Sequence, residues 1–359
     1  MSPVTRMKRW LPRIVRALAV AYPVSLVAVA LLFRYVGEGW WMTTVALYLP
    51  RIGFALPLPF IAAGLSAYRM RRLLWLQAAS ALLVVFPLMG FVLSWPVSAD
   101  DKAPTMRVLS MNVDSGRRGA AEVVAEIDRY SPDVVLLQEL GDNDAFGPLL
   151  RTHYPTVHVS GQFLLATRYG LSSVIEPPKL PYITENRSPR FIEYLLDTPL
   201  GSVHVYNVHP ISPREALSAV RGDEGLKREI GTGRIFEGAA APLVEHNAGL
   251  RTLQVQTIWE SALHETRPVV IAGDTNLPGL SRTLARTWAS GLQDGFSRAG
   301  WGFGYTFPTN KLRPWMRIDR IFASDHLRFV GFQVSPSRVS DHRGVVADLQ
   351  AASPLAGIE

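Results

Sequence analysis

Acidic, amide and imidazole side chains recur in this sequence at or beside the ends of apolar stretches. The set comprises Asn112, Asp114, Glu139, His209, Asp274, Asn276, Asp319, Asp341 and His342. Burying these groups without partners would cost several kcal/mol each. We therefore expect them to meet in one cleft, where they satisfy one another and a cation.

The stretch from Val269 to Gly279, VVIAGDTNLPG, illustrates the pattern. A strand with the composition of a buried strand runs into Asp274 and Asn276. These two residues lie two positions apart and therefore on the same side of an extended chain, while Thr275 faces away. Taken alone, the stretch is also compatible with a strand followed by a turn. Together with the other polar strand ends, it indicates one shared site.

The elements that must hold this site follow a linker at residues 99–104. Short apolar strands alternate there with amphipathic helices. The strands are expected in MRVLSMNV, DVVLLQEL, FIEYLLDT, GSVHVYNVHP, VVIAGD, RIDRIFAS and GVVADLQ, and the helices in GAAEVVAEIDRY and LRTLQVQTIWESALHE. The mixed order of strands predicts packed sheets with helices outside them. This domain is expected to span residues 105–351 and to be followed by a tail at residues 352–359.

Residues 1–98 differ from the rest, because they contain three long apolar segments. We expect three transmembrane helices at about residues 14–33, 52–68 and 74–95, since a helix needs roughly 20 apolar residues to cross the bilayer core. Arg51 precedes the second segment and is expected to extend to the membrane interface. A cleaved signal peptide is an alternative for the first segment, but it leaves the other two unexplained.

Positive charges in the short loops set the orientation of these helices. Basic clusters lie at residues 6–16 and 69–72. Both clusters belong on the cytoplasmic side of the membrane. The sequence therefore predicts a multi-pass protein of the cell membrane, with a bacterial inner membrane as the expected setting. Its N-terminus is expected in the cytoplasm and the domain after residue 105 outside it.

The net charge of +7 does not indicate a nucleic-acid-binding surface. Residues 1–100 hold 10 Lys and Arg against 2 Asp and Glu, whereas residues 101–359 hold 27 against 28. The excess charge belongs to the membrane region, so net charge gives no support for binding along a phosphate backbone. The absence of cysteine excludes disulfides and thiolate metal sites.

Six motifs carry a resemblance to a known family. They are, in chain order, SMNVDSG, DVVLLQEL, VYNVHP, VVIAGDTNLP, RIDRIFAS and VSDHRGVVADL. In this order they resemble the motifs of the endonuclease/exonuclease/phosphatase superfamily, which has the fold of deoxyribonuclease I, over about residues 105–350. The resemblance implies an α/β fold, namely a four-layer α/β/β/α sandwich of two packed mixed sheets flanked by helices. It also implies a metal-dependent hydrolase that acts on phosphate ester bonds.

The resemblance further implies a set of ligands for metal and phosphate. Glu139 matches the family's principal Mg²⁺ ligand, Asn112 lies beside it and Asp341 lies near the metal. Asp114 is a further candidate ligand, and Mn²⁺ is an alternative ion. Oxygen ligands are what Mg²⁺ prefers. Arg190 falls where the family often has a phosphate-binding arginine.

Catalytic roles follow from the same resemblance. Asp274 is expected to orient or deprotonate the attacking water, and Asn276 to hold a phosphoryl oxygen. His209 and His342, the latter positioned by Asp319, are expected to supply a proton or a charge to the phosphate and its leaving oxygen. Metal and cationic side chains stabilise the charge that grows in the transition state.

Confinement at a membrane favours a lipid or lipid-linked phosphate ester as the substrate, over nucleic acid. A membrane-tethered endo- or exonuclease acting on DNA or RNA is the first alternative. A non-catalytic membrane scaffold that kept the fold is the second, and the complete polar set argues against it. Residues 210–249 form a long connection after His209, which is either a lid or specificity element or a tolerated surface insertion.

Overall fold

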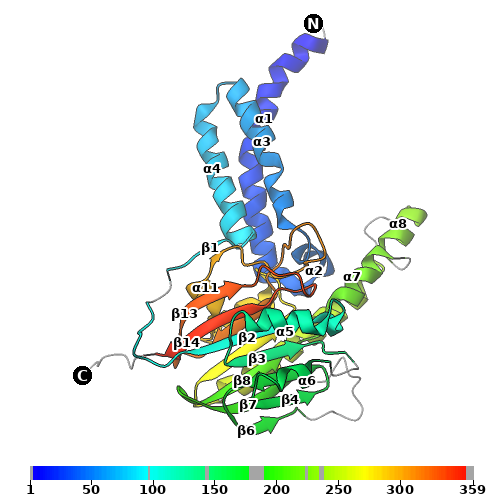
Figure 1. The fold of residues 1–359 in the computed structure, drawn as a ribbon. Helices are drawn as coiled ribbons and strands as arrows, with labels where there is room; N and C mark the ends of the chain where they lie inside the picture. Colours follow the sequence, from blue (N-terminus) through cyan, green and yellow to red (C-terminus); the bar gives the residue numbers. More distant parts are fainter. Residues whose placement is uncertain are drawn as a thin grey trace.

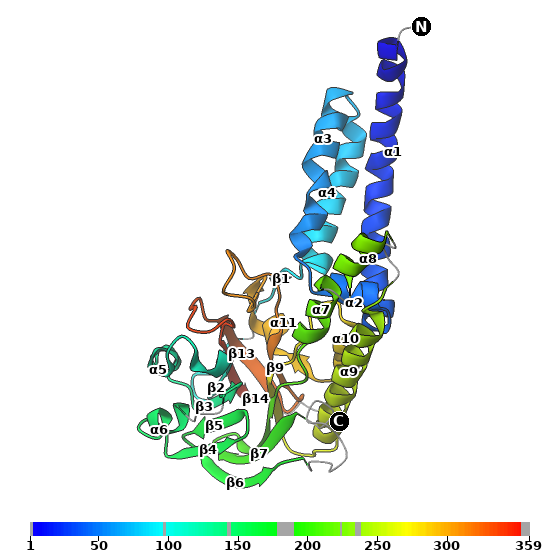
Figure 2. The ribbon, with the colours of Figure 1, turned by 90° about the vertical axis from the view of Figure 1, so that its right-hand side faces the viewer.

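The computed structural model describes residues 3–95, 98–141, 145–177, 190–222, 225–233 and 238–352. Two six-stranded β-sheets pack together in the part of the chain that follows residue 105. A group of long helices, formed by the N-terminal residues, projects from one end of this body (Figures 1 and 2). Nearly all of the expected C-terminal tail, at residues 353–359, lies outside the described residues.

The first sheet has the strand order β13-β14-β2-β3-β5-β4. Its strands are β2 (Met106–Asn112), β3 (Val134–Gln138), β4 (Thr156–Ser160), β5 (Phe163–Thr167), β13 (Leu327–Val334) and β14 (Val345–Ala351). β2 and β3 run parallel, and the other neighbours are antiparallel. The carboxyl ends of β2 and β3 therefore lie at the same edge of the sheet.

The second sheet has the strand order β10-β12-β9-β8-β7-β6. Its strands are β6 (Gly170–Ile175), β7 (Phe191–Thr198), β8 (Gly201–Val208), β9 (Val269–Asp274), β10 (Gln293–Asp294) and β12 (Asp319–Ala323). β8 and β9 are the parallel pair in this sheet. The chain between them includes the segment at residues 210–249, which was expected as a long connection. The described residues of that segment form α7 (Arg214–Arg221), α8 (Leu226–Thr232) and the start of α9 (Ala241–Leu263).

Apolar side chains fill the space between the sheets, with Val108, Leu136, Val205 and Ile321 among them. Alternate residues of each strand face the outer side, where helices cover them. These helices are α5 (Ala120–Asp128) and α6 (Phe146–Leu150) on the first sheet, and α9 and α10 (Arg282–Ala289) on the second. A short helix, α11 (Gly295–Ala299), and a 3-10 turn, η6 (Asp114–Gly116), complete this part. The predicted four-layer α/β/β/α sandwich is confirmed.

The N-terminal helices stand side by side above the sandwich (Figure 1). They are α1 (Pro3–Leu31), η1 (Leu32–Val36), η2 (Gly37–Gly39), α2 (Trp41–Leu47), η3 (Arg51–Ala55), α3 (Pro57–Ala67), η4 (Arg71–Leu73), α4 (Leu74–Leu83) and η5 (Val84–Leu88). Two stretches, Trp10–Gly39 and Arg71–Leu88, are long and apolar enough to cross a membrane. The middle segment is a pair of helices, Trp41–Leu47 and Arg51–Ala67, bent by 92°, and it makes a third span if the pair counts as one.

The last of these helices ends earlier than the expected boundary near residue 95. Helical structure stops at Leu88, and Gly90, just beyond the last helical residue, adopts a positive φ of 75°. The chain then pairs as a short strand, β1 (Val92–Leu93), with β11 (Trp301–Gly302) of the sandwich.

The helices are joined to the sandwich by a shared apolar cluster that includes Met316 and Ile318. Arg51, expected to extend to the membrane interface, is instead buried at this junction. The base of the helices and the sandwich enclose it, and backbone carbonyls surround its guanidinium. The acceptors are the carbonyl oxygens of Leu47, Leu88 and Gly279. Carbonyl groups thus take the place that water and lipid headgroups were expected to fill.

Candidate active site

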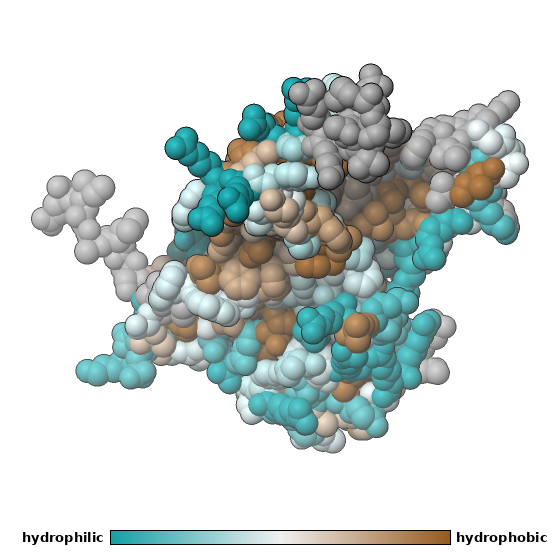
Figure 3. Space-filling view, turned by 90° about the horizontal axis from the view of Figure 1, so that it is seen from above, coloured by the Kyte–Doolittle hydropathy of each residue, from teal (hydrophilic) through white to brown (hydrophobic). Residues whose placement is uncertain are grey.

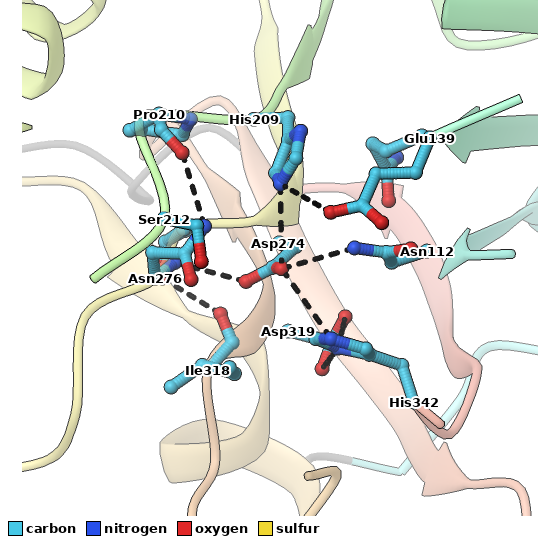
Figure 4. Close-up of polar contacts among 12 residues, drawn as sticks. Asn112, Glu139, His209, Pro210, Ser212, Asp274, Asn276, Ile318, Asp319 and His342 are labelled. Carbon is cyan, nitrogen blue, oxygen red and sulfur yellow. Dashed lines mark hydrogen bonds and ion pairs between the residues drawn. The ribbon is translucent and has the colours of Figure 1, made fainter. Parts of the chain in front are cut away.

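Polar strand ends from both sheets meet at one edge of the sandwich (Figure 4). In the first sheet, Asn112 pairs with Gln138 in parallel register, so Glu139 follows directly beside it. In the second sheet, antiparallel pairing of β9 with β12 sets Asp274 opposite Asp319. Neighbouring strand ends add His209, Asp341 and His342. The topology therefore brings together residues that lie far apart in the sequence.

Asp274 is the centre of this cluster and is 2% exposed. Its Oδ2 accepts a hydrogen bond from Asn112 Nδ2 at 3.2 Å and lies 3.6 Å from Nε2 of both His209 and His342. Burial raises the pKa of Asp274, and the charge of His342 opposes this increase. A buried carboxylate with a raised pKa is suited to take a proton from water at neutral pH.

His342 is held in place through its other ring nitrogen. Nδ1 lies 2.9 Å from Asp319 Oδ2, and the ring packs on Phe307 with the centroids 4.5 Å apart. Burial acts to lower the pKa of His342, but the charges of Asp319 and Asp274 raise it to about 10. The imidazole is therefore protonated at neutral pH, and its Nε2 presents a proton toward the cleft.

His209 is oriented in the same way by an amide in place of a carboxylate. Its Nδ1 lies 2.6 Å from Gln162 Oε1, which accepts the proton on that nitrogen. Its Nε2 then faces Glu139 Oε1 at 3.2 Å and Asp274. Two histidines with fixed rings thus face the same carboxylate from two sides.

Glu139 reaches this group from the end of β3. Burial acts to raise its pKa, but the hydrogen bond and charge of His209 lower it to about 2. The carboxylate is therefore ionised at any pH near neutral. Its backbone has a φ of 57°, which is uncommon for a residue other than glycine. Backbone strain of this kind is concentrated at functional sites.

Two further carboxylates, those of Asp114 and Asp341, lie near Glu139. Burial, and next the charge of Asp341, raises the pKa of Asp114, with Glu139 acting in the same direction. The cations beside them are Arg117, 3.6 Å from Asp114, and Arg214, 3.1 Å from Asp341, and both side chains are more than half exposed. Asp114 and Asp341 have exposed arginines beside them, and Glu139 has His209 beside it. Together the three carboxylates form a donor set that fits a hard divalent cation.

A different group, Asp274, Asp319 and His342, also places ligand atoms within 4.8 Å of one another. In this group the Nδ1 atom of His342 is engaged by Asp319, and the raised pKa keeps the ring protonated. A metal requires a neutral imidazole. This group therefore fits proton transfer better than metal binding.

The loop after β9 is fixed from two directions. Asn276 has a φ of 52° and donates a hydrogen bond from Nδ2 to the carbonyl oxygen of Pro210 at 3.0 Å. Its own carbonyl oxygen accepts a hydrogen bond from the hydroxyl of Tyr48 at 2.8 Å. Tyr48 directly follows α2, so the N-terminal helices hold a residue of the site.

A cavity of about 230 Å³ opens onto the cluster. Its polar wall contains Glu139, Asp274, Asn276 and His342. The apolar wall comes from distant parts of the chain and contains Tyr48, Leu217, Phe307, Trp315, Met316 and Ile318. Arg214 and Arg221 of α7 also line it. We call this space the catalytic cavity.

Arg190 is the residue that was predicted to bind the phosphate. It precedes β7, its carbonyl oxygen accepts the backbone N–H of His209 at 3.0 Å, and it is not among the described residues that line the catalytic cavity. Arginines of α7 line the cavity instead. The expected phosphate-binding role of Arg190 stays a prediction.

Three residues that contact the site, Tyr48, Gln162 and Arg214, were not predicted from the sequence. The signal for Arg214 was its position in the long segment after His209. Gln162 and Tyr48 belong to no motif, and Tyr48 lies 228 positions before the residue that it holds. Their roles arise only from packing between distant elements.

Comparison with known proteins shows the family to which this chain belongs. A model of the Endonuclease/Exonuclease/phosphatase family matches residues 109–342. No curated protein matches. Solved structures with a similar fold include an endonuclease/exonuclease/phosphatase from Beutenbergia cavernae, with 20% identity, a TM-score of 0.47, and coverage of 70% of this chain and 73% of that chain.

Two further solved structures are those of a TDP2 protein and of a 3'-5' exonuclease. A humanized D. rerio TDP2 has 17% identity and a TM-score of 0.48, covering 69% of this chain and 99% of that chain. The 3'-5' exonuclease NExo from Neisseria meningitidis has 18% identity and a TM-score of 0.49, covering 67% and 98%. The match to the family model spans more than half of the chain and contains every residue of the cluster described above. The chain therefore belongs to the Endonuclease/Exonuclease/phosphatase family and is a metal-dependent hydrolase of phosphate esters.

Proposed function

We propose that this protein is a membrane-anchored phosphoesterase that uses Mg²⁺ to hydrolyse a lipid or lipid-linked phosphate ester outside the cytoplasm. The observation that carries the proposal is the catalytic cavity itself. Its apolar wall includes Tyr48 from the N-terminal helices and Trp315 and Met316 beside them. An apolar chain attached to a phosphate could lie along this wall while the phosphate reaches Asp274.

The exposed surface of the N-terminal helices supports membrane anchoring. Large hydrophobic side chains such as Val24, Phe60 and Trp75 are more than half exposed there. Seen along the helices, hydrophobic residues gather at the centre of the molecule, with hydrophilic residues around them (Figure 3). Exposed apolar surface of this extent is stable in lipid and unfavourable in water. The basic clusters at residues 6–16 and 69–72 favour a cytoplasmic N-terminus.

The positions of helices α7 and α8 support the proposal that the substrate comes from the membrane. They project from the sandwich on the same side as the N-terminal helices (Figures 1 and 2). Leu217 of α7 lines the catalytic cavity, and Ile230 of α8 is 60% exposed. Helices α7 and α8 therefore extend from the catalytic cavity toward the side of the molecule on which the bilayer is expected.

The side chains of the cluster support hydrolysis by in-line attack of water. Asp274 accepts the proton of the water, and the new bond forms between the water oxygen and phosphorus. The bond from phosphorus to the leaving oxygen breaks, and the imidazolium of His342 gives that oxygen a proton. Mg²⁺, held by Asn112, Glu139 and Asp341, would supply positive charge to the phosphoryl oxygens. Asn276 and His209 orient the phosphate.

One assay tests the substrate class. The full-length protein, reconstituted in vesicles with Mg²⁺, would be given phospholipids, polyprenyl phosphates, DNA and a bis-aryl phosphodiester. We expect turnover of a lipid substrate, abolished in the Glu139→Gln variant. Cleavage of DNA alone would replace the lipid proposal with a tethered nuclease. No turnover of any substrate by the wild type would favour a scaffold.

Topology needs a separate test. A reporter that is active only in the cytoplasm, fused after Ala99, should be inactive if residues after 99 lie outside it. A periplasm-active reporter at the same position should be active. The reverse pattern would overturn the orientation while leaving the phosphoesterase activity untouched.

A further inference from the structure

A second cavity lies where the N-terminal helices meet the sandwich, and its volume is about 270 Å³. Arg51 lines it from the helices, Arg317 from the segment before β12, and Arg320 from β12 itself. Aromatic side chains of the helix end and of a neighbouring loop, including Phe86 and Phe303, also line it, together with aliphatic side chains such as Leu280 and Leu284. We call this space the junction cavity.

The junction cavity is separated from the catalytic cluster by β12. Successive residues of a strand point to opposite faces. Ile321 belongs to the core between the sheets and Phe322 to the core under α9 and α10. Asp319 therefore faces inward with the catalytic cluster, whereas Arg320 faces outward. Arg320 lies away from the reacting phosphate, although Trp315 and Met316 contribute to both cavities.

Positive charge exceeds negative charge around this cavity. The side chains of Arg320 and Arg317 are 0% and 11% exposed. Asp294 lies 3.7 Å from a guanidinium nitrogen of each, which is longer than a hydrogen bond. The other nearby carboxylate, Asp319, is paired with His342. Burial, and next the charge of Arg317, lowers the pKa of Arg320 to about 9.

Several N–H groups of these arginines have no acceptor. Nε and Nη1 of both Arg317 and Arg320 are buried and make no hydrogen bond within the described part of the chain. Arg317 also stacks on the ring of Phe296, 4.3 Å from its centroid. Buried charged donors are normally paired, because leaving them unpaired costs free energy. These donors therefore call for a ligand that carries negative charge and accepts hydrogen bonds.

We propose that the junction cavity binds the phosphate group of an anionic ligand. Guanidinium groups present their N–H donors in planar forks that match phosphate oxygens, and Arg317 and Arg320 would supply these forks. Arg51 adds a third positive charge from the side of the helices. The aromatic lining at the end of η5 suits the apolar part of a membrane phospholipid. Free inorganic phosphate has the same recognised group and is the alternative source.

Such a ligand would connect the two halves of the molecule. Arg51 also donates a hydrogen bond to the carbonyl oxygen of Gly279, in the loop that begins with Asn276. An anion between Arg51 and the two arginines of the sandwich would offset their mutual repulsion. Binding should therefore stabilise the attachment of the helices to the sandwich, whether or not the enzyme is turning over.

The test uses the full-length protein, freed of lipid in an uncharged detergent with EDTA present. Thermal unfolding would be followed with inorganic phosphate against chloride at equal ionic strength, and with phosphatidylglycerol against phosphatidylcholine. We expect a rise in Tm of about 3 to 6 °C with at least one phosphate-bearing ligand. A rise with phosphatidylglycerol alone identifies a lipid, and a rise with inorganic phosphate identifies a free anion.

Three variants assign the effect to this cavity. Arg320→Met should lose the rise, whereas Arg298→Met, an exposed neighbour on α11, should keep it. Glu139→Gln should also keep it, since phosphate bound in the catalytic cavity would otherwise explain the result. No rise in the wild type, or an equal rise in Arg320→Met, overturns the proposal. If Arg320→Met does not fold, native mass spectrometry decides, with a phosphate or phospholipid adduct expected on the wild type and lost in Arg317→Lys.

Discussion

The catalytic cluster and the junction cavity both bury charged side chains on opposite faces of β12, but they balance charge differently. In the cluster, Asp274 and Asp319 face two histidines at close range. In the junction cavity, Arg317 and Arg320 share Asp294 at 3.7 Å. In the cluster, buried carboxylates and imidazoles of opposite charge balance one another within the chain, and this arrangement holds them ready for catalysis. Buried charge without such balance, as in the junction cavity, is what we propose that an anionic ligand completes.

The largest effect should come from the carboxylate at the end of β3. Glu139→Gln should lower kcat by about 10³-fold or more, because the metal supplies several kcal/mol of transition-state stabilisation. Turnover of a bis-aryl phosphodiester measures this, and chelation of metal should lower the wild type to a similar rate. Glu260→Gln, on the exposed face of α9, is the matched control. Retention of more than about a tenth of the activity in Glu139→Gln would contradict the metal role.

On the junction side, Asp294→Asn should be the most damaging change. Removing the shared carboxylate leaves two buried guanidinium groups uncompensated, which costs about 3 to 5 kcal/mol. A fall in Tm measured in detergent checks this, with Asp325→Asn, an exposed carboxylate, as control. Phosphate should restore part of the loss if the junction cavity binds it. An unchanged Tm would show that the arginines are balanced by other means.

Asp319→Asn should weaken catalysis through His342. The neutral amide no longer favours the imidazolium, so the pKa of His342 should fall from about 10 toward its ordinary value. The alkaline limb of the rate profile should then move to lower pH, with kcat at neutral pH reduced by about 10²-fold. The wild-type imidazolium stabilises the fold fully below about pH 6.5, and this contribution is lost as pH rises through about 10. If the alkaline limb of the Asp319→Asn variant does not move, the pairing of Asp319 with His342 does not control the rate, and this prediction is wrong.

Tyr48→Phe should have the smallest effect of these changes. It removes one hydroxyl from the carbonyl oxygen of Asn276, and such a hydrogen bond contributes about 1 kcal/mol net. We expect a drop of about fivefold in kcat/KM with little change in Tm. Tyr35→Phe, at a 70% exposed position, is the control. Equal results for the two variants would mean that the helices do not support the site.

The sandwich and most of the cluster could be predicted from sequence, because local patterns encode them. Apolar runs that end on Glu139 or Asp274 indicate buried strands with polar ends, and parallel neighbours place such ends together. The order of the six motifs resembles that of a known family, and this resemblance indicates which residues belong to one site. Each of these signals spans only a few positions of the chain.

Contacts between distant segments could not be predicted in this way. Arg51 was expected at the membrane interface. Its neighbours in the sequence contain no signal for the hydrogen bond that it donates to the carbonyl oxygen of Gly279. The connection after His209 proved to be helical, and its Arg214 pairs with Asp341 across 127 positions. The helices Trp41–Leu47 and Arg51–Ala67 are bent by 92° relative to each other, and apolar content alone does not indicate this bend.

The hydrogen bonds from Tyr48 and Arg51 to the loop at residues 276–279 have a consequence for biosynthesis. The N-terminal helices leave the ribosome first, so they are in place before this loop is made. We expect the loop to take its final shape against a template that only a correctly inserted chain provides. If the N-terminal helices cross a membrane as proposed, a molecule that fails to enter the bilayer would carry an incomplete active site and should not hydrolyse its substrate.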